Sequence, residues 1–281
     1  MSVIKQHEIP KGSRLYFGKT AKLKIEFEYE TSLKLLSFGF EPIVTPNFIH
    51  KLDKQNNAIV ISNPDNEHMS LRDDSTMETT RIITKRLGRT TKHKKWFYNQ
   101  PVFRYPSSEN YQIGAEAIDS ENIDDMIKIC LETLASIKQN LSLQLFDMNI
   151  IKKISANENI NFDDFKNSDI NKILKLEIKW LTKLLYVSTC DELRQLIDAT
   201  PTYIQEYLKN LISLTDKIKC DNIIISPLYC SDVVYYEGVA FEVICDKYTI
   251  AKGGKYKVYD MLSCGFSLYT DDILKILRSS K

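Results

Sequence analysis

The segment from residue 96 to residue 119 constrains this chain more than any other part of it. Its letters, Trp-Phe-Tyr-Asn-Gln-Pro-Val-Phe-Arg-Tyr-Pro-Ser-Ser-Glu-Asn-Tyr-Gln-Ile-Gly-Ala-Glu-Ala-Ile-Asp, predict a strand that ends at Arg104, a short turn and a returning strand. Alternate residues of a strand share one face, so Gln112, Gly114 and Glu116 point to the same side of the predicted sheet. A cation and two polar acceptors are thereby placed around one pocket, an arrangement suited to a small zwitterion.

The composition is that of a globular chain without a strong overall charge. Of its 281 residues 43% are hydrophobic, which is enough for a sizeable core. The 38 basic and 37 acidic side chains leave a formal charge of +1, so no long-range attraction to nucleic acid or to an anionic membrane is expected. The first residues lack the apolar stretch of a signal peptide, and no apolar run approaches the roughly 18 residues of a membrane span. We expect a soluble, cytoplasmic protein whose residues 1–281 form a single domain.

Neither the cysteines nor the histidines predict a metal or redox site. The six cysteines are scattered without a Cys-x-x-Cys pair, as expected of reduced thiols. The four histidines are too far apart for zinc ligation or for a Cys–His dyad. We therefore predict no metal and no cofactor. One basic cluster, from Lys85 to Lys95, has two interpretations: a solvated helix end and loop, which we favour, or a nucleic-acid contact.

Hydrophobic spacing predicts an α+β fold in which helices interrupt an antiparallel sheet. Residues 120–140 carry helical periodicity, residues 141–150 and 222–270 are typical of strands, and a helical insertion occupies about 150–220. The apolar positions that define the predicted helices are Ile123, Ile127, Cys130, Leu134 and Ile137; Ile170, Leu174, Ile178, Leu181 and Leu185; and Ile204, Tyr207, Leu211, Leu214 and Ile218.

Two further segments need a decision between patterns. From Leu23 the chain alternates as Leu-Lys-Ile-Glu-Phe-Glu-Tyr-Glu, which is typical of a strand, yet apolar residues also recur at helical spacing up to Gly39. We predict a helix that ends at this glycine. Residues 233–245 are rich in β-branched and aromatic side chains and predict a hairpin strand. The pair Gly253 and Gly254 is interpreted as the turn that follows.

Five separated motifs, taken in order, resemble the catalytic domain of the histidyl-tRNA synthetases, which are class II aminoacyl-tRNA synthetases. Each motif is weak alone, but their order and spacing are jointly specific and span residues 10–274. The resemblance implies an antiparallel sheet flanked by helices and a dimer formed through the first motif. The motifs are Pro-Lys-Gly at 10–12 with Gly-Phe-Glu-Pro-Ile-Val-Thr-Pro at 39–46, Leu-Arg-Asp-Asp-Ser-Thr at 71–76, the segment around Phe103 and Arg104, Tyr-Tyr-Glu-Gly-Val-Ala-Phe-Glu at 235–242, and Gly-Gly-Lys-Tyr at 253–256.

Departures from the synthetase pattern argue against aminoacylation, which needs cations around the ATP phosphates. Tyr105, Pro106 and a short turn replace the long loop of the synthetases, and Asp271 and Asp272 stand where their third motif supplies an arginine. Carboxylates repel phosphate at short range, and we expect these two to cap the last helix instead. No anticodon-binding domain is expected before Lys281. The truncation and the Gly-Phe-Ser-Leu ending resemble the regulatory subunits of ATP phosphoribosyltransferase.

That resemblance implies a non-catalytic function. The chain is expected to bind the short catalytic subunit of ATP phosphoribosyltransferase, to activate it and to help transmit histidine feedback, as a homodimer within a hetero-oligomer. Neither a membrane nor tRNA is an expected partner. Two alternatives stay open: a truncated synthetase paralogue that activates an amino acid with ATP and transfers it to a non-tRNA acceptor, and a binding module with a different catalytic partner.

The amino-acid pocket of the synthetases maps onto this chain as a vestigial or working histidine site. Of the tyrosine pair, Tyr236 is expected to face the pocket and Tyr235 the core. Arg104 alternatively forms a bridge to Glu116 or Asp74, and the buried polar residues alternatively form a structural network. No catalytic residue is assigned. The residues that the resemblance assigns to a histidine ligand are Asp74, Thr76, Arg104, Gln112, Glu116, Tyr236 and Tyr256.

Overall fold

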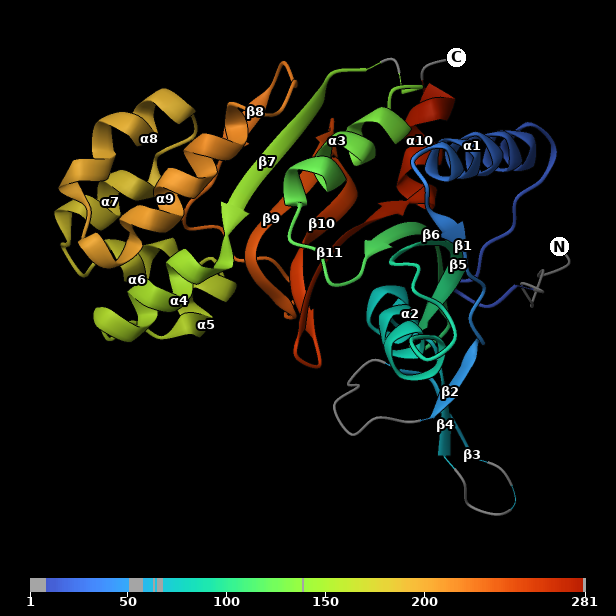
Figure 1. The fold of residues 1–281 in the computed structure, drawn as a ribbon. Helices are drawn as coiled ribbons and strands as arrows, with labels where there is room; N and C mark the ends of the chain where they lie inside the picture. Colours follow the sequence, from blue (N-terminus) through green and yellow to red (C-terminus); the bar gives the residue numbers. More distant parts are fainter. Residues whose placement is uncertain (1–8, 51–57, 63, 65–67, 138, 280–281) are drawn as a thin grey trace, which may run out of the picture. The chain divides into compact units, whose positions relative to one another are not determined.

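A computed structural model describes residues 9–50, 58–62, 64, 68–137 and 139–279 of the chain. Strands and helices are both abundant, which confirms the predicted α+β class (Figure 1). Within these described ranges, no helix is both long enough and apolar enough to cross a bilayer.

The chain divides into two compact units. The first consists of Met1–Ala117 together with Ser267–Lys281, and the second of Ile118–Phe266. The first unit contains the hairpin predicted at residues 96–119 except for its last two residues, and the second contains the helical insertion. The single domain expected from the sequence stays a prediction.

A long β-hairpin forms the centre of the first unit. Its strands β5 (Lys95–Arg104) and β6 (Ser108–Ala117) pair antiparallel along their whole length, which confirms the predicted hairpin. The short strand β1 (Glu41–Pro42) adds a parallel partner to β5, so the sheet is mixed rather than wholly antiparallel. The register places Gln100 opposite Gln112. Opposite residues of paired strands share a face, so the two amides lie on one side of the hairpin.

Helices cover this hairpin and a smaller sheet accompanies it. Both α2 and α10 pack against β6, and α1 packs against α10; Figure 1 shows α1 and α10 side by side. The elements are α1 (Gly18–Ser37), α2 (Ser75–Ile82), the π-helical turn η1 (Ile83–Leu87), α10 (Thr270–Ser279), and the three strands β2 (Phe48–His50), β4 (His68–Leu71) and β3 (Val60–Ser62), which pair in that order.

The conformation of α1 explains the alternating sequence that starts at Leu23. One face of the helix carries the buried residues Phe27, Thr31 and Leu35. Residues two positions apart on a helix lie about 200° apart, so strict alternation produces two apolar stripes on opposite sides. The predicted helix is confirmed, and only one of its stripes is covered. The exposed stripe consists of Ile25 (67% exposed), Tyr29 (64%), Leu33 (48%) and Leu36 (47%).

The second unit combines strands with the helical insertion. Its strand order is β11, β10, β9, β7, β8; β9 pairs antiparallel with both β10 and β7, whereas β7 and β8 are parallel. The last three residues of β11 already belong to the first unit. The elements are α3 (Ile123–Thr133), β7 (Leu141–Asp147), α4 (Met148–Asn157), α5 (Phe162–Lys166), α6 (Ile170–Leu174), α7 (Lys179–Leu185), α8 (Cys190–Leu196), the 3-10 turn η2 (Ile197–Ala199), α9 (Thr202–Thr215), β8 (Ile223–Ile225), β9 (Tyr236–Cys245), β10 (Tyr248–Val258) and β11 (Met261–Tyr269).

The turn predicted at Gly253 and Gly254 is wrong, because both glycines lie inside β10. A Cβ on Gly253 would approach the ring of Phe241 to 2.4 Å, and a Cβ on Gly254 would approach the ring of Tyr236 to 2.9 Å. These glycines are therefore needed for close packing of neighbouring strands rather than for chain reversal.

Two further local predictions also need correction. The helix expected from Ile170 to Leu185 is broken into α6 and α7, because Glu177 between them has a left-handed φ of 54°. The strand expected over 141–150 ends at Asp147, whose carboxylate accepts a hydrogen bond of 2.8 Å from the Asn149 amide. This side chain caps α4, so the strand ends three residues earlier than predicted and the helix begins at Met148.

Candidate ligand-binding site

Tyr98 lies across the face of the hairpin that carries Gln112 and Glu116. It stands opposite Gly114 in the register and is 1% exposed. A Cβ on Gly114 would lie 2.1 Å from Cζ and 2.2 Å from the hydroxyl oxygen of Tyr98. Position 114 must therefore be glycine, because the phenol ring occupies the space that a side chain would fill.

The hydroxyl group of Tyr98 joins three other side chains. It donates to Glu116 over 3.3 Å and lies 3.0 Å from the hydroxyls of both Thr76 and Ser267. Burial raises the pKa of Tyr98, and the nearby charge of Glu116 raises it further. A neutral phenol has a single proton, so when it donates to Glu116 the two hydroxyls must donate to it. The network holds Glu116, which is fully buried, in a fixed orientation.

The first turn of α2 brings two of the predicted residues to this network. Asp74 is the N-cap of the helix, where its Oδ1 accepts a hydrogen bond of 2.8 Å from the Met77 amide. Thr76 is the second residue of the helix, and its hydroxyl lies 3.0 Å from the hydroxyl of Tyr98. The charge of Asp74 also contributes to the raised pKa of Tyr98. The structure thus brings Asp74, Thr76 and Glu116 together around one phenol.

Gln112 lies on the same face, and its side-chain amide is not part of this hydrogen-bond network. Its side chain is 8% exposed, and in the described part of the chain its amide has no hydrogen-bond partner. The opposite residue, Gln100, instead has its Oε1 bonded to the hydroxyl of Thr45 at 3.0 Å. The Gln112 amide is not among the fully buried unpaired side-chain atoms of the described residues, so its donors and acceptor remain available to a polar ligand.

Arg104 ends β5 and is exposed. Across the described ranges it forms no ion pair or hydrogen bond through its side chain, so the alternative bridge to Glu116 or Asp74 is absent. The guanidinium is free to meet an anionic group from outside the chain, as a ligand contact requires.

Tyr236 and Tyr256 belong to the second unit, where they are partners in the register of β9 and β10. They are 5% and 1% exposed, and the ring of Tyr235 packs edge-on against both, with centroids 5.4 Å and 6.0 Å away. Tyr235 is itself only half-buried, so its predicted place in the core is wrong. Within this unit the three rings form one aromatic cluster.

Comparison with known proteins identifies the family. The sequence model of the histidyl-tRNA synthetases matches residues 37–273. A relative from Wolinella succinogenes, named ATP phosphoribosyltransferase regulatory subunit, is 38% identical over 286 residues, which cover 100% of this chain and 100% of the relative. This chain belongs to the ATP phosphoribosyltransferase regulatory subunit family. The family has the histidyl-tRNA synthetase-like domain that the ordered motifs indicated.

Solved structures show that the chain has the class II synthetase-like fold. A Bacillus halodurans C protein, described as an ATP phosphoribosyltransferase regulatory subunit/histidyl-tRNA synthetase, superposes with a TM-score of 0.85 at 16% identity, covering 99% of this chain and 84% of that chain. A chain of the ATP phosphoribosyl transferase complex from Thermotoga maritima superposes with a TM-score of 0.66 at 18% identity, covering 88% and 97%. At such identities the likeness concerns the fold alone.

Two residues that position the candidate site were missed in the sequence. One is Tyr98, which lies inside the predicted hairpin. The other is Arg72 of the motif at 71–76, which is fully buried and donates to the carbonyls of Thr45 (3.1 Å) and Pro101 (2.7 Å). Burial lowers the pKa of Arg72. Its position in a recognised motif was the available signal, but spacing alone does not reveal that an arginine is buried.

Proposed function

We propose that this chain is the non-catalytic regulatory subunit of an ATP phosphoribosyltransferase and acts in histidine biosynthesis in the cytoplasm. It would bind the short catalytic subunit, activate it and help transmit feedback by histidine. Membership of the family supports this function, as does the fold shared with a chain of the Thermotoga maritima transferase complex. Activation and feedback need only that binding of the partner or of histidine differ between two states of the assembly.

A histidine pocket in the first unit is the site that we propose for the feedback ligand. The observation that carries it is the Gln112 side-chain amide, which forms no hydrogen bond within the described residues, on the same face as the buried Glu116 carboxylate. The α-amino group of histidine would pair with Glu116 and Asp74 near Thr76. Arg104 stands opposite Ser108, eight positions along β6 from Glu116, which is roughly 26 Å at the rise of a strand. A carboxylate on the same carbon as the amino group cannot reach that far, so Arg104 stays a prediction of the family resemblance. That Tyr236 and Tyr256 contact the imidazole of the ligand stays a prediction from the family resemblance.

Calorimetric titration of histidine tests the pocket directly. Gln112→Ala and Glu116→Gln should each weaken binding about tenfold or more, since each removes a buried polar contact of about 1.5–3 kcal/mol. Ser62→Ala, an exposed strand position of the small sheet, is the control and should bind like the wild type. Wild-type protein that gives no heat at millimolar histidine would contradict the pocket.

Activation of a partner tests the regulatory function. The chain should form a stoichiometric complex with the short catalytic subunit of its own organism and raise its turnover. The alternative, activation of an amino acid with ATP, predicts pyrophosphate exchange. We expect none, because Asp271 and Asp272 stand where the third motif of the synthetases supplies an arginine. Clear exchange with any amino acid would overturn the non-catalytic assignment.

We further propose that two copies of the chain pair through α1. The support is its uncovered apolar stripe, in which Ile25 and Leu33 are 67% and 48% exposed while the opposite face is buried. Monomeric proteins rarely leave such a stripe in water. Ile25→Glu with Leu33→Glu should convert a dimer to a monomer in light scattering, whereas Glu30→Gln on the exposed part of the same helix should not. A monomeric wild type at micromolar concentration would refute the pairing.

A further inference from the structure

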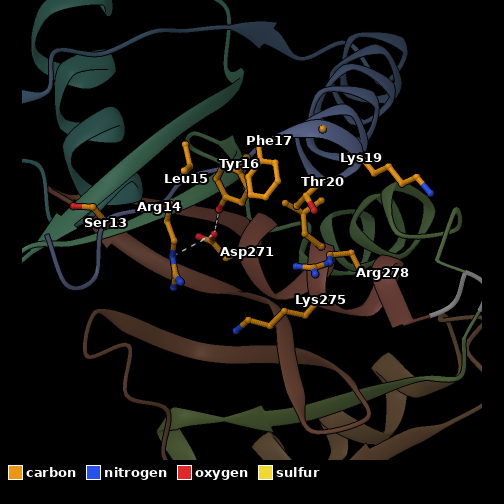
Figure 2. Close-up of a pocket in the computed structure, with 12 residues that line it drawn as sticks. Ser13, Arg14, Leu15, Tyr16, Phe17, Lys19, Thr20, Asp271, Lys275 and Arg278 are labelled. Carbon is orange, nitrogen blue, oxygen red and sulfur yellow. Dashed lines mark hydrogen bonds and ion pairs between the residues drawn. The ribbon is translucent and has the colours of Figure 1, made fainter. Parts of the chain in front are cut away.

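The first unit contains a second candidate site, on the other side of its hairpin. A cavity of about 630 Å³ lies between residues 13–20 and one face of α10 (Figure 2). Adjacent residues of a strand point to opposite faces: Gln112 points to the predicted histidine site, whereas the ring of Tyr111 packs edge-on against Tyr16 of the cavity wall, with centroids 5.8 Å apart. The two sites are therefore separated by the sheet.

The wall of this cavity carries an excess of positive charge. Arg14, Lys19, Lys275 and Arg278 line it, and Asp271 is the one acidic residue among the twelve that do. The side chain of Arg278 forms no ion pair or hydrogen bond in the described part of the chain. The side chain of Lys275 pairs with Asp272 and is still 46% exposed. Cations gathered in a concave surface attract an anionic small molecule.

Asp271 offsets one of these cations, Arg14, and its carboxylate also holds the wall together. It accepts hydrogen bonds from the Tyr16 hydroxyl and, at 2.9 Å, from the Tyr111 amide, and its distance to Nε of Arg14 is 3.6 Å. Figure 2 shows Tyr16 and Arg14 both directed at this carboxylate, whereas Arg278 stands apart from it. The expectation that Asp271 and Asp272 cap α10 is wrong, because the helix begins at Thr270 and both lie inside its first turn. The contacts of Asp271 instead fix residues 14–16 against the hairpin and the helix.

The start of α1 adds to the positive potential. Phe17 stands at the N-cap position, where no side chain accepts from the helix, and the first turn contains no acidic residue. The free N–H groups at the start of a helix are partial positive charges, and Gly18, Lys19 and Thr20 of this turn line the cavity. This contribution is secondary to that of the cationic side chains.

Apolar side chains flank the cations. Leu15 and Phe17 line the same cavity and are 64% and 76% exposed, so a ligand with a ring or an alkyl group would bury surface against them. The volume lies within the range of small-molecule sites. We propose that this cavity binds a small phosphorylated molecule with an aromatic or aliphatic group, its phosphates held by Lys275 and Arg278 and its apolar part by Phe17. The site does not depend on the proposed histidine pocket.

Titration of the full-length chain with inorganic pyrophosphate and with ADP at low salt tests the phosphate contacts. Lys275→Gln with Arg278→Gln should weaken both ligands by about tenfold or more. Arg89→Gln with Lys92→Gln removes the same charge from exposed positions outside the cavity and should leave the affinities within about twofold. Histidine binding should be the same in both pairs of variants, since the sheet separates the sites.

A third variant tests the apolar wall. Phe17→Ala should weaken ADP severalfold and leave pyrophosphate unchanged, because only ADP carries a ring. Equal affinities of the wild type and the Lys275/Arg278 variant would overturn the site, as would the absence of binding at millimolar ligand or an equal loss in the control pair. Equal binding of ADP to the wild type and to Phe17→Ala would overturn the proposed ring contact.

Discussion

Replacing Gly114 by alanine is the most direct way to test how Tyr98 positions the candidate histidine site. The added Cβ would lie 2.1 Å from Cζ of Tyr98, so the ring would have to retreat by about 1.3 Å to reach the 3.4 Å at which ordinary contact begins. Tyr98 is 1% exposed, so the ring would have to move against buried neighbours. A retreat would also lengthen the contacts of its hydroxyl with Thr76, Ser267 and Glu116.

The expected cost follows from these two effects. Overpacking of a well-filled interior costs about 1–3 kcal/mol, and each lost hydrogen bond about 0.5–1.5 kcal/mol. We therefore expect Gly114→Ala to lower the free energy of unfolding by about 3 kcal/mol or more, and to weaken histidine binding because Glu116 loses its orienting phenol. Urea unfolding followed by far-UV circular dichroism measures the first effect, and calorimetry the second.

A double-mutant cycle isolates the contact between the two residues. Truncation of the ring by Tyr98→Ala removes the clash, so Gly114→Ala should cost much less in that background, with a coupling energy of about 1–3 kcal/mol. Gly39→Ala is the matched control: this glycine has φ +80° and nothing within 4 Å of its added Cβ, so only a backbone cost of about 1 kcal/mol is expected. A stable Gly114→Ala variant with zero coupling to Tyr98 would refute the geometry.

Three further predictions concern stability. Arg72→Lys should cost about 3 kcal/mol or more in urea unfolding, because an ammonium group cannot reach the acceptors at Thr45 and Pro101 that the buried guanidinium joins; a cost like that of exposed Arg86→Lys would contradict it. Gly254→Ala should lower the unfolding midpoint, because its Cβ would lie 2.8 Å from Ala240 and 2.9 Å from the Tyr236 ring, whereas a turn position would tolerate the change. Burial raises the pKa of Asp147 to about 6 from about 3.9 in the unfolded chain, so the folded state binds more protons between these two values. The free energy of unfolding should therefore fall as the pH rises from 4 to 6, by up to about 3 kcal/mol. Asp147→Asn keeps the helix cap and should flatten that dependence; an unchanged pH profile would contradict the shift.

Much of the site was predictable because its signal is local. A strand of period two fixes which side chains share a face, so the sequence around Gln112 and Glu116 was enough to place both on one side of a hairpin. The helix α2 and the N-cap position of Asp74 were not predicted, and only the family motif at 71–76 pointed to Asp74 and Thr76. The order of five motifs was enough to indicate the family.

The sequence failed where the decisive contact joins distant parts of the chain. Alternation from Leu23 does not say which of the two stripes of α1 is covered, and helical spacing from Ile170 does not show the break at Glu177. The pair Gly253 and Gly254 is typical of a turn in sequence, but the two glycines leave space inside β10 for the rings of Phe241 and Tyr236.

What the sequence determined by itself is the family, the fold class and the direction of the side chains along the hairpin, since these depend on local periodicity and on the order of motifs. Only the tertiary structure decided that Tyr98 fills the space above Gly114, that Arg72 is buried among carbonyls and that Asp271 holds the second cavity together. The reason is physical: burial and hydrogen-bond partners are set by residues that the folded chain brings together from far apart in the sequence.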